Sequence, residues 1–135
     1  MADEKLMIDS SILIDYFRKT DKSKSKLVSH FRLYDQLYIS SITEFEVLNG
    51  ATALQKEFWE GMMARLIVLN FDSLAARKAT EIVTQLKAKR KSIDKPDLFI
   101  AATAVVHGLK LDTLNIKHFV DINELVLLSS DRNPT

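Results

Sequence analysis

The sequence predicts a three-layer α/β sandwich, in which helices cover both faces of a central, mostly parallel sheet. Short apolar runs alternate along the chain with segments of helical periodicity, as expected for parallel strands that are buried on both faces. The chain has 135 residues, of which 47% are hydrophobic and 27% are charged, which suits one globular domain with one core. We therefore expect a single domain over residues 1–135, with its core at about 6–128.

Five short apolar runs are predicted to be strands, because they are rich in leucine, isoleucine or valine and are bounded by polar residues. These runs are residues 6–8, 37–39, 66–69, 109–113 and 125–128. The expected helices are residues 12–17, 26–33, 43–50, 55–64, 72–90 and 97–107, with a short helical turn at 116–120. Ligands of such folds bind beyond the carboxyl ends of the strands, where the strand order reverses.

Two helix starts carry capping signals. Ser10 or Ser11 is expected to cap the first helix, since a serine oxygen can accept a hydrogen bond from a free backbone N–H group. Thr43 and Glu46 are spaced as in a capping box at the start of the third helix.

The helix at 97–107 is expected to be the central one, because it is apolar on most sides. Pro96 stands at its start and Gly108 at its end, which matches the usual preference for these residues. His107 is expected at its C-terminal end.

Several classes of protein are excluded. No apolar run approaches the ~18 residues of a membrane-spanning helix, and the polar segment 1–5 is unlike a secretory signal. We therefore expect a soluble, cytoplasmic protein with no membrane partner. The chain has no cysteine, and its three histidines lack zinc-site spacing, so any metal would be bound by oxygen.

The net charge of +1 conceals two basic blocks, at residues 18–26 and 87–91. Such blocks can form a rim that holds a phosphate backbone, because phosphate contacts need cations but no base reading. They can equally be solvated helix ends, where cations are favoured. The candidate RNA contacts are Lys22, Lys24, Lys89, Arg90 and Lys91.

Three acids fall at the same predicted edge of the sheet. Asp9 follows the first strand, Glu46 lies in the helix after the second, and Asp97 stands in the first turn of the central helix. Taken singly, each can be a helix-capping residue. Taken together, carboxylates ~4 Å apart repel by about 4 kcal/mol at an effective dielectric near 20, so a cluster needs a proton or a cation. Oxygen ligands suit Mg²⁺ or Mn²⁺, which indicates metal-assisted phosphodiester hydrolysis.

Four blocks of the sequence carry a resemblance to a known family. They are residues 8–15 (IDSSILID), 39–50 (ISSITEFEVLNG), 97–104 (DLFIAATA, followed by His107 and Gly108), and Thr113-Leu114-Asn115 with Phe119. In order and spacing they resemble the PIN-domain ribonucleases, in particular the VapC-like toxins of toxin–antitoxin pairs. The resemblance extends from Leu6 to Leu128 and implies a PIN-like fold.

The resemblance implies a metal-dependent RNA endonuclease. Asp9, Glu46 and Asp97 would hold one or two Mg²⁺ or Mn²⁺ ions, and an activated water would cleave RNA. Ser11 and Thr113 would orient the acids by hydrogen bonds. Asn115 would take a fourth, more variable catalytic place.

Three positions depart from the family pattern. Asn115 is neutral where many relatives carry aspartate, and His118 stands where an acid before Phe119 is common; we expect His118 at the surface, not as a ligand. Asp112 occupies a place that is usually apolar. It either compensates for the missing acid or is a solvent-exposed strand residue, and strand alternation points it to the face opposite Thr113.

The resemblance also implies partners. A VapC-like toxin would form a homodimer and would be held inactive by a cognate antitoxin whose C-terminal segment covers the acidic pocket. Residues 58–63 (FWEGMM) are either an apolar surface for a partner helix or ordinary core.

Two other function classes remain in view. Asn115 and His118 favour a catalytically impaired PIN-like scaffold that binds RNA or protein. A phospho-acceptor receiver domain is disfavoured, because such a domain needs an aspartate after a central later strand and a lysine after the last one. Here Asn70 follows one of these strands and Ser129 follows the other.

Overall fold

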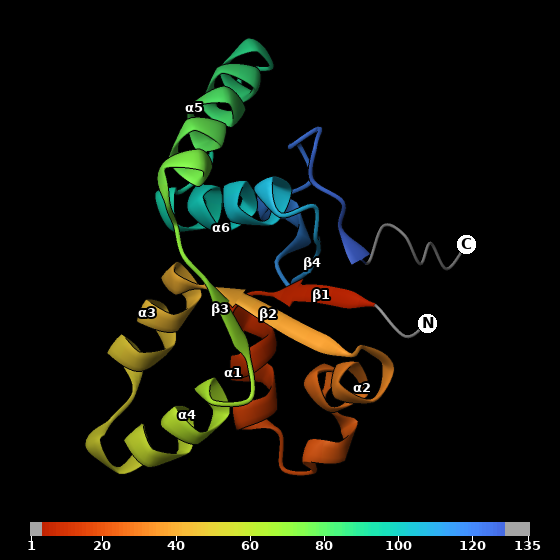
Figure 1. Ribbon diagram of the computed structural model, residues 1–135, viewed down its shortest axis with the longest axis vertical. Helices are drawn as coiled ribbons and strands as arrows, with labels where there is room; N and C mark the ends of the chain where they lie inside the picture. The colour runs from red at the N-terminus through yellow and green to blue at the C-terminus, as the bar shows by residue number, and fades with distance from the viewer. Residues whose placement is uncertain (1–3, 129–135) are drawn as a thin grey trace.

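The computed structural model describes residues 4–128, which form a four-stranded parallel sheet with helices on both faces (Figure 1). The strands are β1 (Lys5–Ile8), β2 (Gln36–Ser40), β3 (Ile67–Leu69) and β4 (Lys110–Asp112), in the order β3-β2-β1-β4. Every neighbouring pair is parallel. The predicted three-layer α/β fold is therefore confirmed.

The strand predicted at 125–128 is wrong. This segment meets the sheet only at an isolated bridge between Leu127 and Leu111. Two features explain the difference. Its partner β4 is only three residues long, and the side chains of Leu125 and Leu127 are buried in the core, so packing and not a ladder holds the segment.

Six α-helices and three 3₁₀ turns connect the strands within residues 4–128. The helices are α1 (Ser10–Arg18), α2 (Lys26–Leu33), α3 (Ser41–Gly50), α4 (Lys56–Met63), α5 (Ser73–Ala88) and α6 (Lys95–Val106). The turns are η1 (Lys22–Lys24), η2 (Ala53–Gln55) and η3 (Ile116–His118). None of these helices is long and apolar enough to cross a membrane.

The helix caps differ from the predicted ones. Asp9, not Ser10 or Ser11, caps α1 by accepting a hydrogen bond from the Ser11 backbone N–H. Ser40 caps α3 and accepts from the Thr43 backbone N–H, so the capping box of Thr43 and Glu46 does not form. Helix α3 begins two residues earlier than expected, which leaves the Glu46 side chain free for other contacts.

Two apolar clusters cover the two faces of the sheet. Met7 and Leu111 point toward α5 and α6, whereas Leu6 and Ile8 point toward α1, α2 and α4, as strand alternation requires. Helix α6 has six buried residues and is central, as predicted. In α4, Trp59, Met62 and Met63 are buried in the second cluster, so this part of the segment 58–63 is core.

The strand order places the expected ligand site. The chain runs from β1 to β2 to β3 in one direction and then crosses through α5 and α6 to β4 on the other side of β1. The order therefore reverses between β1 and β4, and their carboxyl ends lead to Asp9 and Thr113.

We predict that Gly108→Ala lowers the free energy of unfolding by about 1 kcal/mol, because Gly108 has a left-handed φ of 65°. A Cβ at this position would meet no atom within 4 Å, so the effect is one of backbone conformation alone. Gly61→Ala is the matched control: its Cβ also meets nothing, but Gly61 lies within α4, where alanine should stabilise by about 0.5–1 kcal/mol. Urea unfolding measures the change in the free energy of unfolding for both variants. The prediction is contradicted if both variants are stabilised or both are destabilised.

Candidate active site

Asp9 is the most constrained acid of the site. It follows β1, is 3% exposed, and has hydrogen bonds to both carboxylate oxygens. Oδ1 accepts from the Ser11 backbone N–H at 3.0 Å and from the Ser11 hydroxyl at 2.5 Å, while Oδ2 accepts from the Thr113 hydroxyl at 2.6 Å. The residues expected to orient the acids therefore both contact Asp9.

Burial raises the pKa of Asp9 above its usual value, although the hydrogen bonds from Ser11 and Thr113 oppose this shift. The carboxylate is thus held in a place that water solvates poorly. A protonated or cation-bound carboxyl would be more stable there than a free anion.

Glu46 lies half-buried on α3, where the Ser10 hydroxyl donates to its Oε1 at 3.2 Å. Burial raises the pKa of Glu46, the Ser10 bond lowers it, and the negative charges of Asp97 and Asp9 raise it further. All three predicted acids are therefore close enough to interact electrostatically, although they come from segments far apart in the sequence.

Asp97 stands in the first turn of α6, two residues after the helix start at Lys95. Its Oδ2 lies 3.0 Å from Nδ1 of His118, and the His118 side chain is 53% exposed. His118 is a surface residue, as expected, but it also contacts a predicted metal ligand, which the sequence did not indicate.

The donor set of the site fits a hard divalent cation. Its acids supply only oxygen ligands. The negative charges of Asp97 and Asp9 repel that of Glu46, and a bound cation would neutralise this repulsion. Within residues 4–128, however, no three acidic or imidazole side chains stand at metal-ligating distances from one another. The three acids converge without forming a closed ligand cage.

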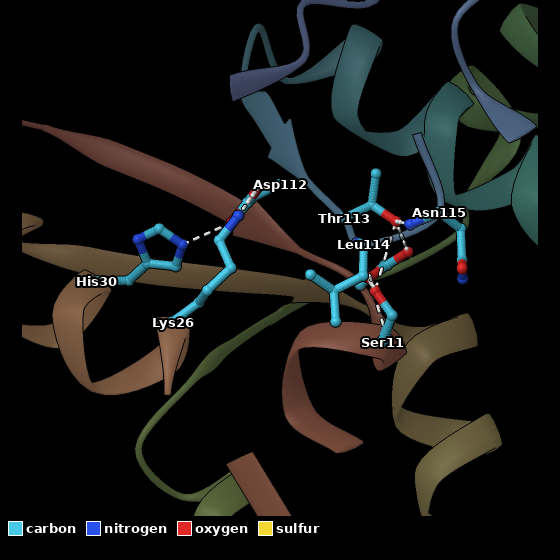
Figure 2. A network of polar contacts seen from close by, with 8 residues as sticks. Ser11, Lys26, His30, Asp112, Thr113, Leu114 and Asn115 are labelled. Atoms are coloured by element: carbon cyan, nitrogen blue, oxygen red, sulfur yellow. Dashed lines mark hydrogen bonds and ion pairs between the residues drawn. The ribbon is translucent and has the colours of Figure 1, made fainter. Parts of the chain in front are cut away.

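A short loop after β4 completes the site (Figure 2). The Leu114 backbone N–H donates to the Ser11 hydroxyl at 2.9 Å, and the Asn115 N–H donates to the Thr113 hydroxyl at 2.9 Å. Leu114 and Asn115 are exposed. These bonds hold the backbone of Leu114 and Asn115 at the exposed edge of the site.

Besides a hollow of about 330 Å³ that is lined by Glu46, Arg18 and Trp59, two hollows flank the acids. One has a volume of about 490 Å³ and runs along α1 from Ser11 and Asn115 to Arg18 and Lys19. The other, of about 230 Å³, lies beside Asp97 and His118 and is also lined by Lys117 and Asp121. Cations border both hollows.

The basic residues that were predicted to contact RNA differ in whether their side chains already have partners within the protein. The Lys22 ammonium donates to the backbone carbonyls of Tyr16, Phe17 and Lys19, so it caps the end of α1 and does not face outward. Lys24, by contrast, is exposed.

The second basic block lies at the end of α5. Lys89 donates to the Asp121 carbonyl and to the Asn123 side chain, and Lys91 lies 4.0 Å from the Asp121 carboxylate. These contacts place the block beside the hollow of Asp97. Arg90 is exposed and has a left-handed φ of 60°.

Asp112 is not solvent-exposed, and it does not join the acids. It is fully buried and faces α2, where Oδ2 lies 2.6 Å from Nε2 of His30 and 3.0 Å from the Lys26 ammonium (Figure 2). Burial favours a higher pKa for Asp112, but the bonds from His30 and Lys26 outweigh it and lower the pKa. Strand alternation predicts the face to which Asp112 points, but α2 covers that face. His30 was missed because no local pattern pairs residues 82 positions apart.

We predict that Asp9→Asn raises the melting temperature at pH 7. Burial raises the folded-state pKa of Asp9, so the folded protein binds the proton more tightly than the unfolded chain, and the charged form destabilises the fold at neutral pH. As the pH falls through this raised pKa toward the usual value of about 4, the wild type takes up the proton and the difference between the proteins narrows.

Asp21→Asn is the matched control for thermal unfolding between pH 7 and 4. Asp21 has the same local bonds, from the backbone N–H and hydroxyl of Ser23, but it is exposed. It should show no comparable gain. An Asp9→Asn protein that is no more stable than the wild type at pH 7 would contradict the burial argument.

Comparison with known proteins identifies the family. Residues 6–125 match the model of the PIN domain. Ribonuclease VapC1 of Rickettsia felis is 35% identical, over 92% of this chain and 95% of its own length. Ribonuclease VapC1 of Methanocaldococcus jannaschii is 31% identical, over 96% of this chain and 90% of its own length. Among solved structures, DNA-bound VapBC from Salmonella typhimurium superposes with a TM-score of 0.78 at 29% identity, covering 92% of this chain and 96% of that one. The chain belongs to the PIN-domain family and, within it, to the VapC ribonucleases.

Proposed function

We propose that this protein is a metal-dependent RNA endonuclease and the toxin of a toxin–antitoxin pair. The observation that carries the proposal is the buried Asp9 carboxylate, held by Ser11 and Thr113 at the β1/β4 reversal, with the charges of Glu46 and Asp97 acting on the same place. The VapC names of the relatives support the same reaction.

Asp9, Glu46 and Asp97 would hold the ion, for which their oxygen donors suit Mg²⁺ or Mn²⁺. Such an ion supplies charge neutralisation on the phosphodiester and a more acidic attacking water. Ser11 and Thr113 keep both oxygens of Asp9 in fixed directions. Asn115 adds a polar contact without a further negative charge, which lessens repulsion of the RNA phosphate at the exposed edge of the site.

The RNA path would cross the acids from one hollow to the other. Along α1, Arg18 and Lys19 offer cations to the phosphates, and exposed Leu114 offers an apolar surface to a base. Lys24 lies on the same basic block. On the other side, Lys117 lines the hollow beside Asp97, and Lys89, Arg90 and Lys91 lie behind it. Lys22 contributes by holding the end of α1.

The partners would be RNA, a cognate antitoxin and a second copy of the chain, in the cytoplasm. The solved relatives that carry VapBC and toxin–antitoxin descriptions support the antitoxin. A domain over residues 1–135 with its core at about 6–128 remains our prediction for the extent of this unit.

We predict that the purified chain, free of antitoxin, cleaves RNA with Mg²⁺ or Mn²⁺ and not with EDTA. Asp9→Asn and Asp97→Asn should each lower the rate by at least about 100-fold, because even the hydrogen-bond partners of metal ligands are commonly worth 10–100-fold. Cleavage of labelled RNA measures the rates, and Asp21→Asn serves as the matched control.

Two outcomes would contradict the proposed ribonuclease activity. One is a wild type that cleaves no RNA with either metal. The other is an Asp97→Asn protein with full activity. If Asn115→Asp cleaves RNA and the parent chain does not, the protein is the catalytically impaired scaffold.

We predict that Arg18→Ala weakens RNA binding and makes it less salt-dependent. Losing one phosphate contact should reduce the slope of log K against log salt by about 0.7 for single strands. RNA binding is measured over a range of salt concentrations with proteins that also carry Asp9→Asn, so that the RNA is not cleaved. Lys78→Ala is the control, since Lys78 is paired with Glu81 and Glu124 away from both hollows. If Arg18→Ala and Lys78→Ala have the same slope of log K against log salt, Arg18 does not contact the RNA.

A further inference from the structure

Asp112 makes two kinds of contact at the end of β4, one with its side chain and one with its backbone. Its side chain points to α2, whereas its backbone carbonyl accepts the Asp9 N–H at 3.3 Å. The next residue, Thr113, donates to the Asp9 carboxylate at 2.6 Å. The position of Asp112 therefore sets two of the contacts that hold Asp9.

Backbone pairing alone holds β4 weakly. The strand has three residues, pairs with β1 on one side, and has a single bridge to Leu127 on the other. A strand this short gains few ladder hydrogen bonds. Its side-chain anchors accordingly decide where its end lies.

Helix α2 supplies those anchors from one face. Lys26 and His30 are four residues apart, so both side chains point the same way, and both reach Asp112 (Figure 2). Both carboxylate oxygens are engaged, Oδ1 by Lys26 at 3.1 Å and Oδ2 by both partners. Because an unpaired buried carboxylate is strongly unfavourable, the partners confine Asp112 to a narrow range of positions.

We propose that Asp112, held by His30 and Lys26, is a positioning residue that sets Thr113 against Asp9. This inference rests on the proposed nuclease function for its effect on catalysis. It concerns the geometry of Asp9 itself, which can be measured without substrate or metal. The side chains of Asp112, Lys26 and His30 bond to one another and not to the carboxylates of Asp9, Glu46 or Asp97.

The test compares amide hydrogen exchange in Asp112→Asn with that in the wild type. The reporters are the N–H groups of Asp9, Leu114 and Asn115, whose acceptors lie in this region. The reference is the N–H of Ile82, which is buried in α5 within the other core cluster. The three reporters should exchange about tenfold faster relative to Ile82, the change expected when one hydrogen bond to a charged group is lost.

Three further variants separate positioning from loss of stability. Ile82→Val loosens the core at α5 and should leave the ratio of reporter to reference rates at or below the wild-type ratio. Lys26→Met removes one anchor that is 33% exposed, so it folds even if Asp112→Asn does not, and it should show the same pattern more weakly. Lys26→Arg keeps the charge and should restore the wild-type ratio.

With RNA and Mn²⁺, Asp112→Asn should lower kcat by about tenfold and leave KM nearly unchanged. The proposal is overturned if the reporters keep wild-type rates, or if all four amides accelerate equally in Asp112→Asn and Lys26→Met. A wild type without ribonuclease activity would defeat the proposed function instead, while the exchange ratios would still decide the positioning role.

Discussion

The hydrogen bonds that join Asp9 to Ser11 and Thr113 connect the fold to its chemistry. They tie the start of α1 to the loop after β4, across the point where the strand order reverses. Asp9 also caps α1, so the same carboxylate ends a strand, starts a helix and faces the site. The backbone N–H groups of Leu114 and Asn115 bond to the same two hydroxyls, so the loop after β4 depends on this contact.

Two buried carboxylates lie close in the fold but in opposite electrostatic situations. Asp9 has only neutral hydroxyl and amide donors, and burial leaves its pKa raised. Asp112 has a lysine and a histidine, and its pKa is lowered. The first is suited to receive a cation from outside, whereas the second already has cationic partners of its own. The charge of Asp9 is therefore available to bind a cation, whereas the charge of Asp112 stabilises the fold.

The sequence was sufficient for elements whose signals are local, and insufficient where distant residues meet. Apolar runs predicted four parallel strands, and the motif blocks predicted that Ser11 and Thr113 would contact an acid. The pattern at 125–128 predicted a fifth strand, because apolar content does not reveal whether a neighbouring strand is long enough to pair. The burial of Asp112 depends on Lys26 and His30, and this pairing leaves no trace in local spacing. The inward turn of Lys22 is a local contact with the backbone at the end of α1, but charge patterning does not distinguish a lysine that donates to backbone carbonyls from one that faces solvent.

All four strands point the same way, so the two ends of the sheet have different properties. The carboxyl ends carry the acids, while the opposite end begins with Lys5 and includes the turn at Gly108. For protein engineering, a fluorescent reporter or affinity handle attached to the exposed side chain of Lys5 would lie at the end of β1 opposite to Asp9. That direction of attachment leaves the surface of the acids open for immobilisation or imaging experiments.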